Sequence, residues 1–283
     1  MCFHREEIPG RFGDFPDVSA DVGGLLEQGT RARRPSNCTR LRQIMSKLKR
    51  ILCPVDFSSA SRRALQFAVA MQGARDAQVT ALHVGRCISL FPALVAGVEP
   101  AVVPFPQRGE RALNAARFVE PFATPYRPID IVFDEGNVAD VIVATASRLK
   151  SDLIVIGTHG RGRLSHQLIG SVAADVVRNA TCPVLVVGPA CEVPPTTGGF
   201  RRIIRGPSAS ERRYAEQFAE GPGSSPFCLA TGGYDEIHQM VEVVKPDLLV
   251  ISRHSDAADR LMQHATYALL AVGPTQPSSS APA

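Results

Sequence analysis

Short aliphatic runs alternate along most of the chain with amphipathic stretches of helical length. Five apolar runs are predicted as strands, over residues 51–55, 79–84, 129–133, 153–156 and 184–187. Four stretches are predicted as helices: from Ser58 or Ser59 to about Met71, from Arg108 to about Phe122, over 138–149 and over 171–179. The strands are aliphatic on both faces, which is typical of a parallel sheet covered by helices. We therefore expect a Rossmann-like α/β fold, an open parallel five-stranded sheet with helices on both faces.

Several stretches fall outside this pattern. Residues 1–48 show no sustained period and are interpreted as an extension that is disordered or loosely packed. An alternative is that translation starts at Met45, which opens MSKLKRILCPVDFS. Residues 86–107 are rich in proline and aliphatic residues and predict an irregular lobe. Residues 190–200 are predicted as a linker and 275–283 as a disordered tail.

Residues 201–274 partly repeat residues 49–189, which indicates an internal duplication. KRILCPVDFS at 49–58 is echoed by RRIIRGPSAS at 201–210, and DLIVIGTHG at 152–160 by DLLVISRHS at 247–255. PVLVVGP at 183–189 is echoed by ALLAVGP at 268–274. The second copy is shortened, because Asp152 lies 101 positions after Ile51 whereas Asp247 lies only 44 after Ile203.

The bulk composition excludes several classes of function. A hydrophobic content of 45% and a charged content of 20% are those of a globular protein, and a net charge of +4 gives no basic face for nucleic acid. No apolar run is long enough to cross a membrane, and the start MCFHREEIPG lacks the apolar core of a secretory signal. Seven scattered cysteines without a C-x-x-C pair indicate reduced thiols and a cytoplasmic location.

The stretch GTHGRGRLSHQLIGSV at 157–172 joins a predicted strand to a predicted helix and carries the candidate chemistry. Gly157 and Gly160 allow the main chain to approach an anion closely. Gly170 and Ser171 open a helix whose first N–H groups are unpaired and favour an anion. Arg161 and Arg163 can add positive charge at the rim. Together these features predict a phosphate-binding loop at the carboxyl edge of the sheet.

The spacing of these residues separates this loop from two common phosphate-binding motifs. A Walker A loop needs a Gly-Lys pair, which the chain lacks. The dinucleotide pattern G-x-G-x-x-G starts at Gly160 and Gly162, but Ser165 stands where the third glycine belongs. The spacing present is G-x2-G-x9-G-S, formed by Gly157, Gly160, Gly170 and Ser171.

This spacing, together with ILCPVDFS at 51–58 and LHV at 82–84, resembles the universal stress protein family. The similarity covers about 50–189, and 200–274 as a degraded second copy. In ATP-binding members, the resemblance implies that Pro54, Val55 and Asp56 face adenine and ribose and that Val84 packs on the base. Ile156, Gly157 and Gly160 would line the ribose and the α-phosphate. Gly170, Ser171 and Val172 would hold the β- and γ-phosphates, with Mg²⁺.

Simpler interpretations of these residues remain open. Asp56 is a favoured type of N-cap and could only cap the helix that follows it. Gly170 and Ser171 could be no more than a helix start. The four histidines considered are interpreted as packed or solvent-facing rather than as ligands: His83, His159, His166 and His254. Cys53 and Cys182 are interpreted as small core residues, and the basic run at 40–50 as a solvated lead-in to the first strand.

The second copy departs from the motif at each position that can be compared. In a gapless alignment Asp56 becomes Ser208, Gly157 becomes Ser252, and Gly160 becomes Ser255. No counterpart of Gly170-Ser171 exists, so we expect this copy to bind no nucleotide. Its last strand, 269–272, matches 184–187, the edge strand through which family members commonly dimerise. We expect the second copy to cover that edge as a pseudo-dimer partner within the chain, and a homodimer is also possible.

The resulting functional prediction is an ATP-binding regulatory protein of the stress response, with one intact site. No nucleophile, general base or catalytic metal set is visible near the loop, so we expect no enzyme, and at most slow ATP hydrolysis with Arg161 and Arg163 stabilising charge. One alternative is a nucleotide-free interaction module. The other is an adenylyl-transfer enzyme, which would need an H-x-G-H motif that the chain lacks.

Overall fold

The structure, a computed structural model, describes residues 48–85, 108–158, 170–188, 191–193, 199–219, 227–228, 233–255, 257–263 and 267–273. The predictions for the N-terminal extension, the lobe at 86–107 and the C-terminal tail therefore lie outside the described residues. Within the described ranges, no helix combines the length and the apolar character needed to cross a membrane.

Strands and helices alternate through residues 50–187 in the predicted order. The elements are β1 (Arg50–Pro54), α2 (Ser59–Arg75), β2 (Gln78–Gly85), α4 (Arg108–Val119), β3 (Ile129–Glu135), α5 (Val138–Arg148), β4 (Leu153–Gly157), α6 (Ser171–Asn179) and β5 (Val184–Val187). Most boundaries agree with the prediction within two residues, but α4 stops at Val119, short of the predicted end near Phe122. Helix α2 runs one turn beyond Met71, because its last polar residues are buried and bonded: Gln72 donates to the Pro128 carbonyl at 3.2 Å and Arg75 to the Gln217 carbonyl at 2.9 Å.

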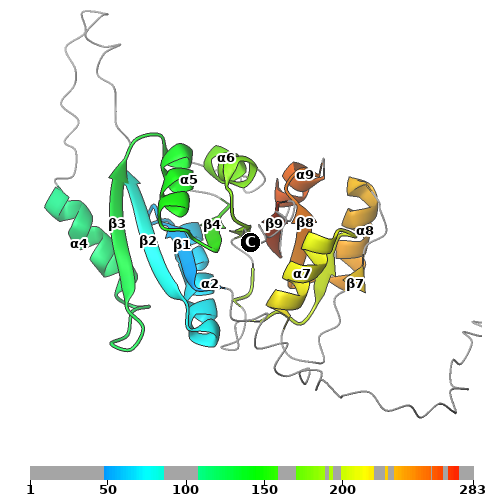
Figure 1. The fold of residues 1–283 in the computed structure, drawn as a ribbon, viewed down its shortest axis with the longest axis horizontal. Coiled ribbons are helices and arrows are strands. Elements are labelled where there is room, and N and C mark those ends of the chain that lie inside the picture. Colours follow the sequence, from blue (N-terminus) through cyan, green and yellow to red (C-terminus); the bar gives the residue numbers. More distant parts are fainter. Residues whose placement is uncertain are drawn as a thin grey trace, which may run out of the picture. The chain divides into compact units, whose positions relative to one another are not determined.

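The five strands of this half form a parallel sheet in the order β3-β2-β1-β4-β5 (Figure 1). The predicted fold class is therefore confirmed. After β1 the chain adds β2 and β3 on one side of it and then returns to place β4 on the other side. The strand order thus reverses between β1 and β4, and this is the switch point at which open α/β sheets bind ligands.

Side chains of each strand alternate between two buried clusters, one on each face of the sheet. Ile51 and Cys53 of β1 pack in the same cluster as Phe67 of α2. Leu52 and its neighbour Ile154 belong to the opposite cluster, which holds α5 and α6. Because both faces are covered, β1, β4 and β5 are buried at nearly every position, and this explains why these strands are continuous aliphatic runs.

The remaining elements extend the same sheet beyond β5. They are β6 (Ile203–Arg205), α7 (Ala209–Phe218), β7 (Phe227–Cys228), α8 (Tyr234–Val244), β8 (Leu248–Ser252), α9 (Ala258–Gln263) and β9 (Ala268–Val272). Strands β9-β8-β6-β7 follow one another in that order and are parallel. Strand β9 pairs antiparallel with β5, with Leu185 opposite Leu270. The edge of β5 is thus covered from within the chain, in one nine-stranded mixed sheet.

The two halves of this sheet begin with the same local arrangement. The Arg50 N–H donates to the Asp152 carboxylate at 2.9 Å, and the Arg202 N–H donates to the Asp247 carboxylate at 3.0 Å. In return, the N–H of Asp152 and that of Asp247 each donate at 2.8 Å to the carbonyl of their arginine. The strand pairs β1–β4 and β6–β8 therefore start in equivalent registers.

The predicted linker at 190–200 packs into the core at both of its described ends. Cys191 and Phe200 are each only 2% exposed. The Phe200 ring lies 6.4 Å from the ring of Phe67 in α2 and 6.3 Å from that of Phe218 in α7. These aromatic contacts join the first helix of each half.

Candidate functional site

The candidate site lies where β1 and β4 end side by side. Their pairing joins Ile51 to Leu153 and Leu52 to Ile154, and it does not extend to the last residues, Pro54 and Gly157. Helix α2 begins just after β1, and α6 begins at this same edge of the sheet after the loop that follows β4. Two helix N-termini, each with main-chain N–H groups favourable to anions, therefore belong to this edge.

Asp56 is held against the first turn of α2. Its Oδ1 accepts from the Ser58 N–H at 3.1 Å and from the Ser58 hydroxyl at 2.6 Å. Ser58, and not Asp56, is the N-cap of α2, since its Oγ accepts from the Ser61 N–H at 3.2 Å. The capping role considered for Asp56 is therefore wrong, because the carboxylate sits two residues before the cap and orients it.

The turn between Asp56 and Ser58 contains a residue that sequence analysis missed. Phe57 has φ 66°, a left-handed conformation that is uncommon for a bulky residue. Its ring stacks on His83 at 4.4 Å between centroids, and the His83 Nδ1 is 2.8 Å from the Val55 carbonyl. His83 is thus a packed histidine, as expected, and it fixes the turn that presents Asp56. No sequence pattern signals this pairing of an aromatic ring with a strained backbone.

The apolar residues predicted to line the site divide between the two faces of the sheet. Val84, Ile156 and Val172 all join the cluster under α5 and α6. Val55 joins the opposite cluster with α2, and Pro54 is buried at the end of β1. The first three residues thus lie on the same face of the sheet, the one covered by α5 and α6.

Gly157 is required by close packing. A Cβ built on it would lie 2.8 Å from both the carbonyl carbon and the oxygen of Ala60, in the first turn of α2. The absent side chain therefore allows α2 to approach β4. The sequence suggested that Gly157 lets a ligand approach. The structure shows a second reason for glycine, close helix packing, which holds whether or not a ligand binds.

Helix α6 starts directly against the end of β4. The Gly170 N–H donates to the Thr158 carbonyl at 2.6 Å, so the two ends of the loop between them are joined. Gly170 is the N-cap, and no side chain caps it with a hydrogen bond. Ser171 is exposed at the first helical position. An uncapped helix end with an adjacent hydroxyl is suited to bind an anion.

Three predicted site residues, Gly160, Arg161 and Arg163, lie outside the described residues, together with His159 and His166. Their place relative to Gly157 and Ser171 stays a prediction.

The cysteines and metal-binding side chains in the described ranges do not point to other chemistry. Cys53 and Cys182 are buried core residues, as predicted, and burial raises the pKa of both thiols, that of Cys182 to about 11. Across the described part of the chain, no group of three or more histidine, cysteine or acidic side chains is placed to hold a metal ion.

Relatives in sequence match the half of the chain that contains this site. Universal stress protein MJ0531 of Methanocaldococcus jannaschii is 36% identical over 142 residues, which are 49% of this chain and 81% of the relative. Universal stress protein MJ0577 of the same organism is 30% identical over 155 residues, covering 49% of this chain and 94% of the relative.

Solved structures share the fold over a longer stretch. A universal stress protein from Archaeoglobus fulgidus aligns with a TM-score of 0.57, at 12% identity, over 80% of this chain and 99% of its own. The functionally unknown protein PA1789 from Pseudomonas aeruginosa aligns with a TM-score of 0.54, at 12% identity, over 81% and 94%. At such identities the likeness shows the fold alone.

The sequence model of the universal stress protein family matches residues 47–188, the stretch that runs from the lead-in to β1 to the end of β5. This chain therefore belongs to the universal stress protein family.

Proposed function

We propose that the chain binds ATP at the carboxyl ends of β1 and β4 and acts as a regulatory protein of the stress response. The convergence of Asp56 with the N-termini of α2 and α6 at the switch point carries this proposal. In this arrangement Asp56 binds the ribose or the base, while the N–H groups of Ser171 and Val172, which follow the cap residue Gly170, bind the terminal phosphates. Gly160, Arg161 and Arg163 complete the phosphate side.

The adenine base can pack against apolar side chains on the α6 face of the sheet. Val84, Ile156 and Val172 belong to one cluster on the α6 face of the sheet, so a base packed on this face lies on the same side as the helix that holds the phosphates. Mg²⁺ enters with the triphosphate and neutralises part of its charge. The protein itself supplies orientation and hydrogen bonds rather than metal ligands.

A binding role fits this site better than a catalytic one. Asp56 is already bonded to Ser58, and His83 is engaged by Phe57 and Val55, so neither is presented as a general base. Nucleotide binding is then best understood as stabilising one conformation of the chain. The three described free thiols, at Cys53, Cys182 and Cys191, fit the expected cytoplasmic location.

We also propose that residues 201–274 are a shortened duplicate that acts as a pseudo-dimer partner. The matching Arg50–Asp152 and Arg202–Asp247 bonds and the mirrored strand order around β5 and β9 support this. Among the described elements, the duplicate has one strand and one helix fewer between β6 and β8 than the first half has between β1 and β4, which contributes to its shortness.

The test is calorimetric titration of ATP with Mg²⁺ into the full chain and into Ser171→Glu. A glutamate at the first position of α6 is favourable for the helix dipole, so the fold is retained. The same charge repels phosphate, and we expect ATP affinity to fall about 10- to 100-fold. Asn114→Glu, an equal charge change at an exposed position of α4, is the control and should leave the affinity unchanged.

Each alternative has its own outcome in this experiment. Equal affinities for the full chain and Ser171→Glu contradict the phosphate site at α6. An absence of ATP binding to the unmodified chain favours the nucleotide-free interaction module. Turnover of ATP with a second substrate favours the adenylyl-transfer enzyme. Gly160→Val tests the loop itself, because a side chain there should block its approach to the ligand.

A further inference from the structure

The carboxylate of Glu211 is buried at the carboxyl end of β8. The side chain belongs to the first turn of α7 and is 4% exposed. One of its oxygens accepts from the Ser208 N–H at 2.8 Å, and the other accepts from the Ser252 N–H at 2.7 Å. The carboxylate therefore bridges the start of a helix and the last residue of a neighbouring strand.

Helix capping accounts for only one of these two bonds. Ser208 and Glu211 form a capping box, in which the Ser208 hydroxyl accepts from the Glu211 N–H at 3.2 Å and the Glu211 carboxylate returns a bond to Ser208. A capping box needs no second oxygen. The bond to Ser252, 41 positions away, is an additional contact that holds the carboxylate between the two strand ends.

The backbone around Glu211 leaves room for this carboxylate. A Cβ built on Gly206 would lie between 2.3 and 2.6 Å from the Glu211 carboxylate atoms. Gly206 is not among the described residues with positive φ, so its conformation does not require glycine. Glycine is required at this position because the Glu211 carboxylate occupies the space that a side chain would need.

The first half is arranged differently at this edge, because the N–H of its own cap residue, Ser58, donates to the Asp56 carboxylate at 3.1 Å. The residue three after the cap of α2 is Ser61, whose short side chain bonds locally to the Ser58 carbonyl at 3.1 Å. The counterpart of Ser252 is Gly157, because the next N–H in each case donates to the adjacent strand, from Thr158 to Val187 at 3.0 Å and from Arg253 to Val272 at 2.9 Å. Successive N–H groups of a strand point to opposite sides, so those of Gly157 and Ser252 point toward β1 and β6 respectively.

We infer that the second half contains an anion site, formed by the N–H groups of Ser208 and Ser252, and that the Glu211 carboxylate is its built-in occupant. The site would take a small carboxylate if Glu211 were absent. Its existence does not depend on the proposed function.

The experiment is thermal unfolding of the full chain, without nucleotide, in sodium acetate or in sodium chloride at equal concentration. Glu211→Ala removes the occupant and leaves two partly buried N–H groups without an acceptor, so we expect the unfolding midpoint to fall by about 4–8 °C. Acetate should recover at least half of this fall, and chloride should not. Glu216→Ala, at an exposed position of the same helix, should show neither effect.

Two results would overturn the inference. One is a midpoint of Glu211→Ala no lower than that of Glu216→Ala, and the other is recovery that is absent or equal in the two salts. If Glu211→Ala folds only when acetate is present, the inference is supported. Glu211→Gln guards against a variant that does not fold at all: its amide offers one oxygen to two N–H groups, so a midpoint equal to that of the unmodified chain would also reject the site.

Discussion

At Gly157 both helix packing and the proposed ligand site require a residue without a side chain. The atoms that a Cβ would meet are main-chain atoms of Ala60, which cannot move aside as a flexible side chain would. A glycine in a phosphate loop is usually explained by its ligand, but here the helix that follows β1 already excludes any side chain. Stability and binding should therefore both respond to this residue.

We expect Gly157→Ala to lower the free energy of unfolding by about 1–3 kcal/mol, because the added methyl overpacks the contact between α2 and β4. Urea denaturation of the full chain without nucleotide measures this change. Gly109→Ala is the control, since a Cβ at Gly109 in α4 meets nothing within 4 Å. It should be neutral, or stabilising by up to about 1 kcal/mol through helix propensity. Equal stability of the two variants would contradict the packing explanation.

The buried thiols should make stability sensitive to alkaline pH. Burial raises the pKa of Cys182 and Cys191 from the ordinary 9.0 to about 11. The unfolded chain loses these protons near the ordinary pKa, whereas the folded chain keeps them until about pH 11. Their stabilising contribution is therefore complete below about pH 9 and is lost as the pH rises through about 11.

At about pH 10 we expect the two thiols together to cost the folded state about 2–3 kcal/mol relative to about pH 8. Urea denaturation at the two pH values measures this loss. A Cys182→Ala, Cys191→Ala double variant is the reference, because the loss should shrink by that amount in it. An identical pH dependence of the double variant would show that the thiols titrate alike in both states.

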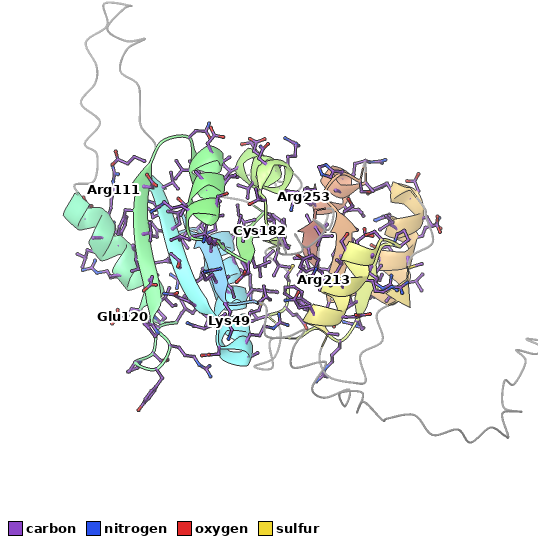
Figure 2. The ribbon with its side chains drawn as sticks, viewed as in Figure 1. Lys49, Arg111, Glu120, Cys182, Arg213 and Arg253 are labelled. Carbon is purple, nitrogen blue, oxygen red and sulfur yellow. The ribbon has the colours of Figure 1, made fainter. Side chains whose placement is uncertain are left out.

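Helix α6 is fixed at its two ends by different halves of the chain. At its N-terminus Gly170 bonds to Thr158, and at its C-terminus Arg253, just after β8, donates to the carbonyls of Ala180 and Cys182, the latter at 2.8 Å (Figure 2). A cation is favourable at this end of a helix dipole. Burial lowers the pKa of Arg253, and these carbonyls compensate for the lost water. The second half thus positions the helix that carries the proposed phosphate site.

Arg253→Met should lower the free energy of unfolding by about 2–4 kcal/mol, because two buried carbonyls lose charged donors. Arg253→Lys retains one donor group, so its free energy of unfolding should lie between those of the unmodified chain and Arg253→Met. Arg212→Met, at an exposed position of α7, should change stability by less than about 0.5 kcal/mol. Chemical denaturation of the three variants decides the matter, and an Arg253→Met variant as stable as Arg212→Met would refute the anchoring role.

The sheet as a whole runs through both halves, with β5 and β9 in its interior (Figure 1). An exposed aliphatic edge at β5 would invite pairing with another chain, and the antiparallel β9 removes that edge. The two domains expected from the sequence therefore share one sheet. Rings of Phe67, Phe200 and Phe218 and the bond from Arg75 to Gln217 reinforce the junction.

Hydrogen exchange of the full chain tests this continuity. We expect amides of Val184–Val187 and Ala268–Val272 to exchange as slowly as those of β1, since all have strands on both sides. Strand β3, paired only with β2 among the described strands, should show faster exchange at alternate residues. Exchange of β5 at the rate of β3 would mean that the halves separate in solution.

Much of the first half could be predicted because its signals are local. Burial on both faces favours continuous aliphatic runs, so the five strands were predicted within two residues of their observed ends, and Ser58 was one of the two serines predicted to start α2. The edge of the sheet that holds Asp56 and Gly157 followed from parallel topology. Errors occurred where a distant contact decided the outcome: the last turn of α2 continues because Arg75 reaches Gln217, 142 positions away.

The spacing of neighbouring residues was sufficient to predict the alternation of strands and helices, the family and the candidate loop. The three-dimensional structure was needed to establish the antiparallel register in which β9 covers β5, that Ser58 rather than Asp56 caps α2, that Arg253 holds the end of α6, and that Glu211 bonds to Ser252. The first, third and fourth join segments many positions apart, and the second depends on which oxygen a main-chain N–H meets. Periodicity carries no information about such partners, because hydrogen bonds and strand pairing are fixed by proximity in space.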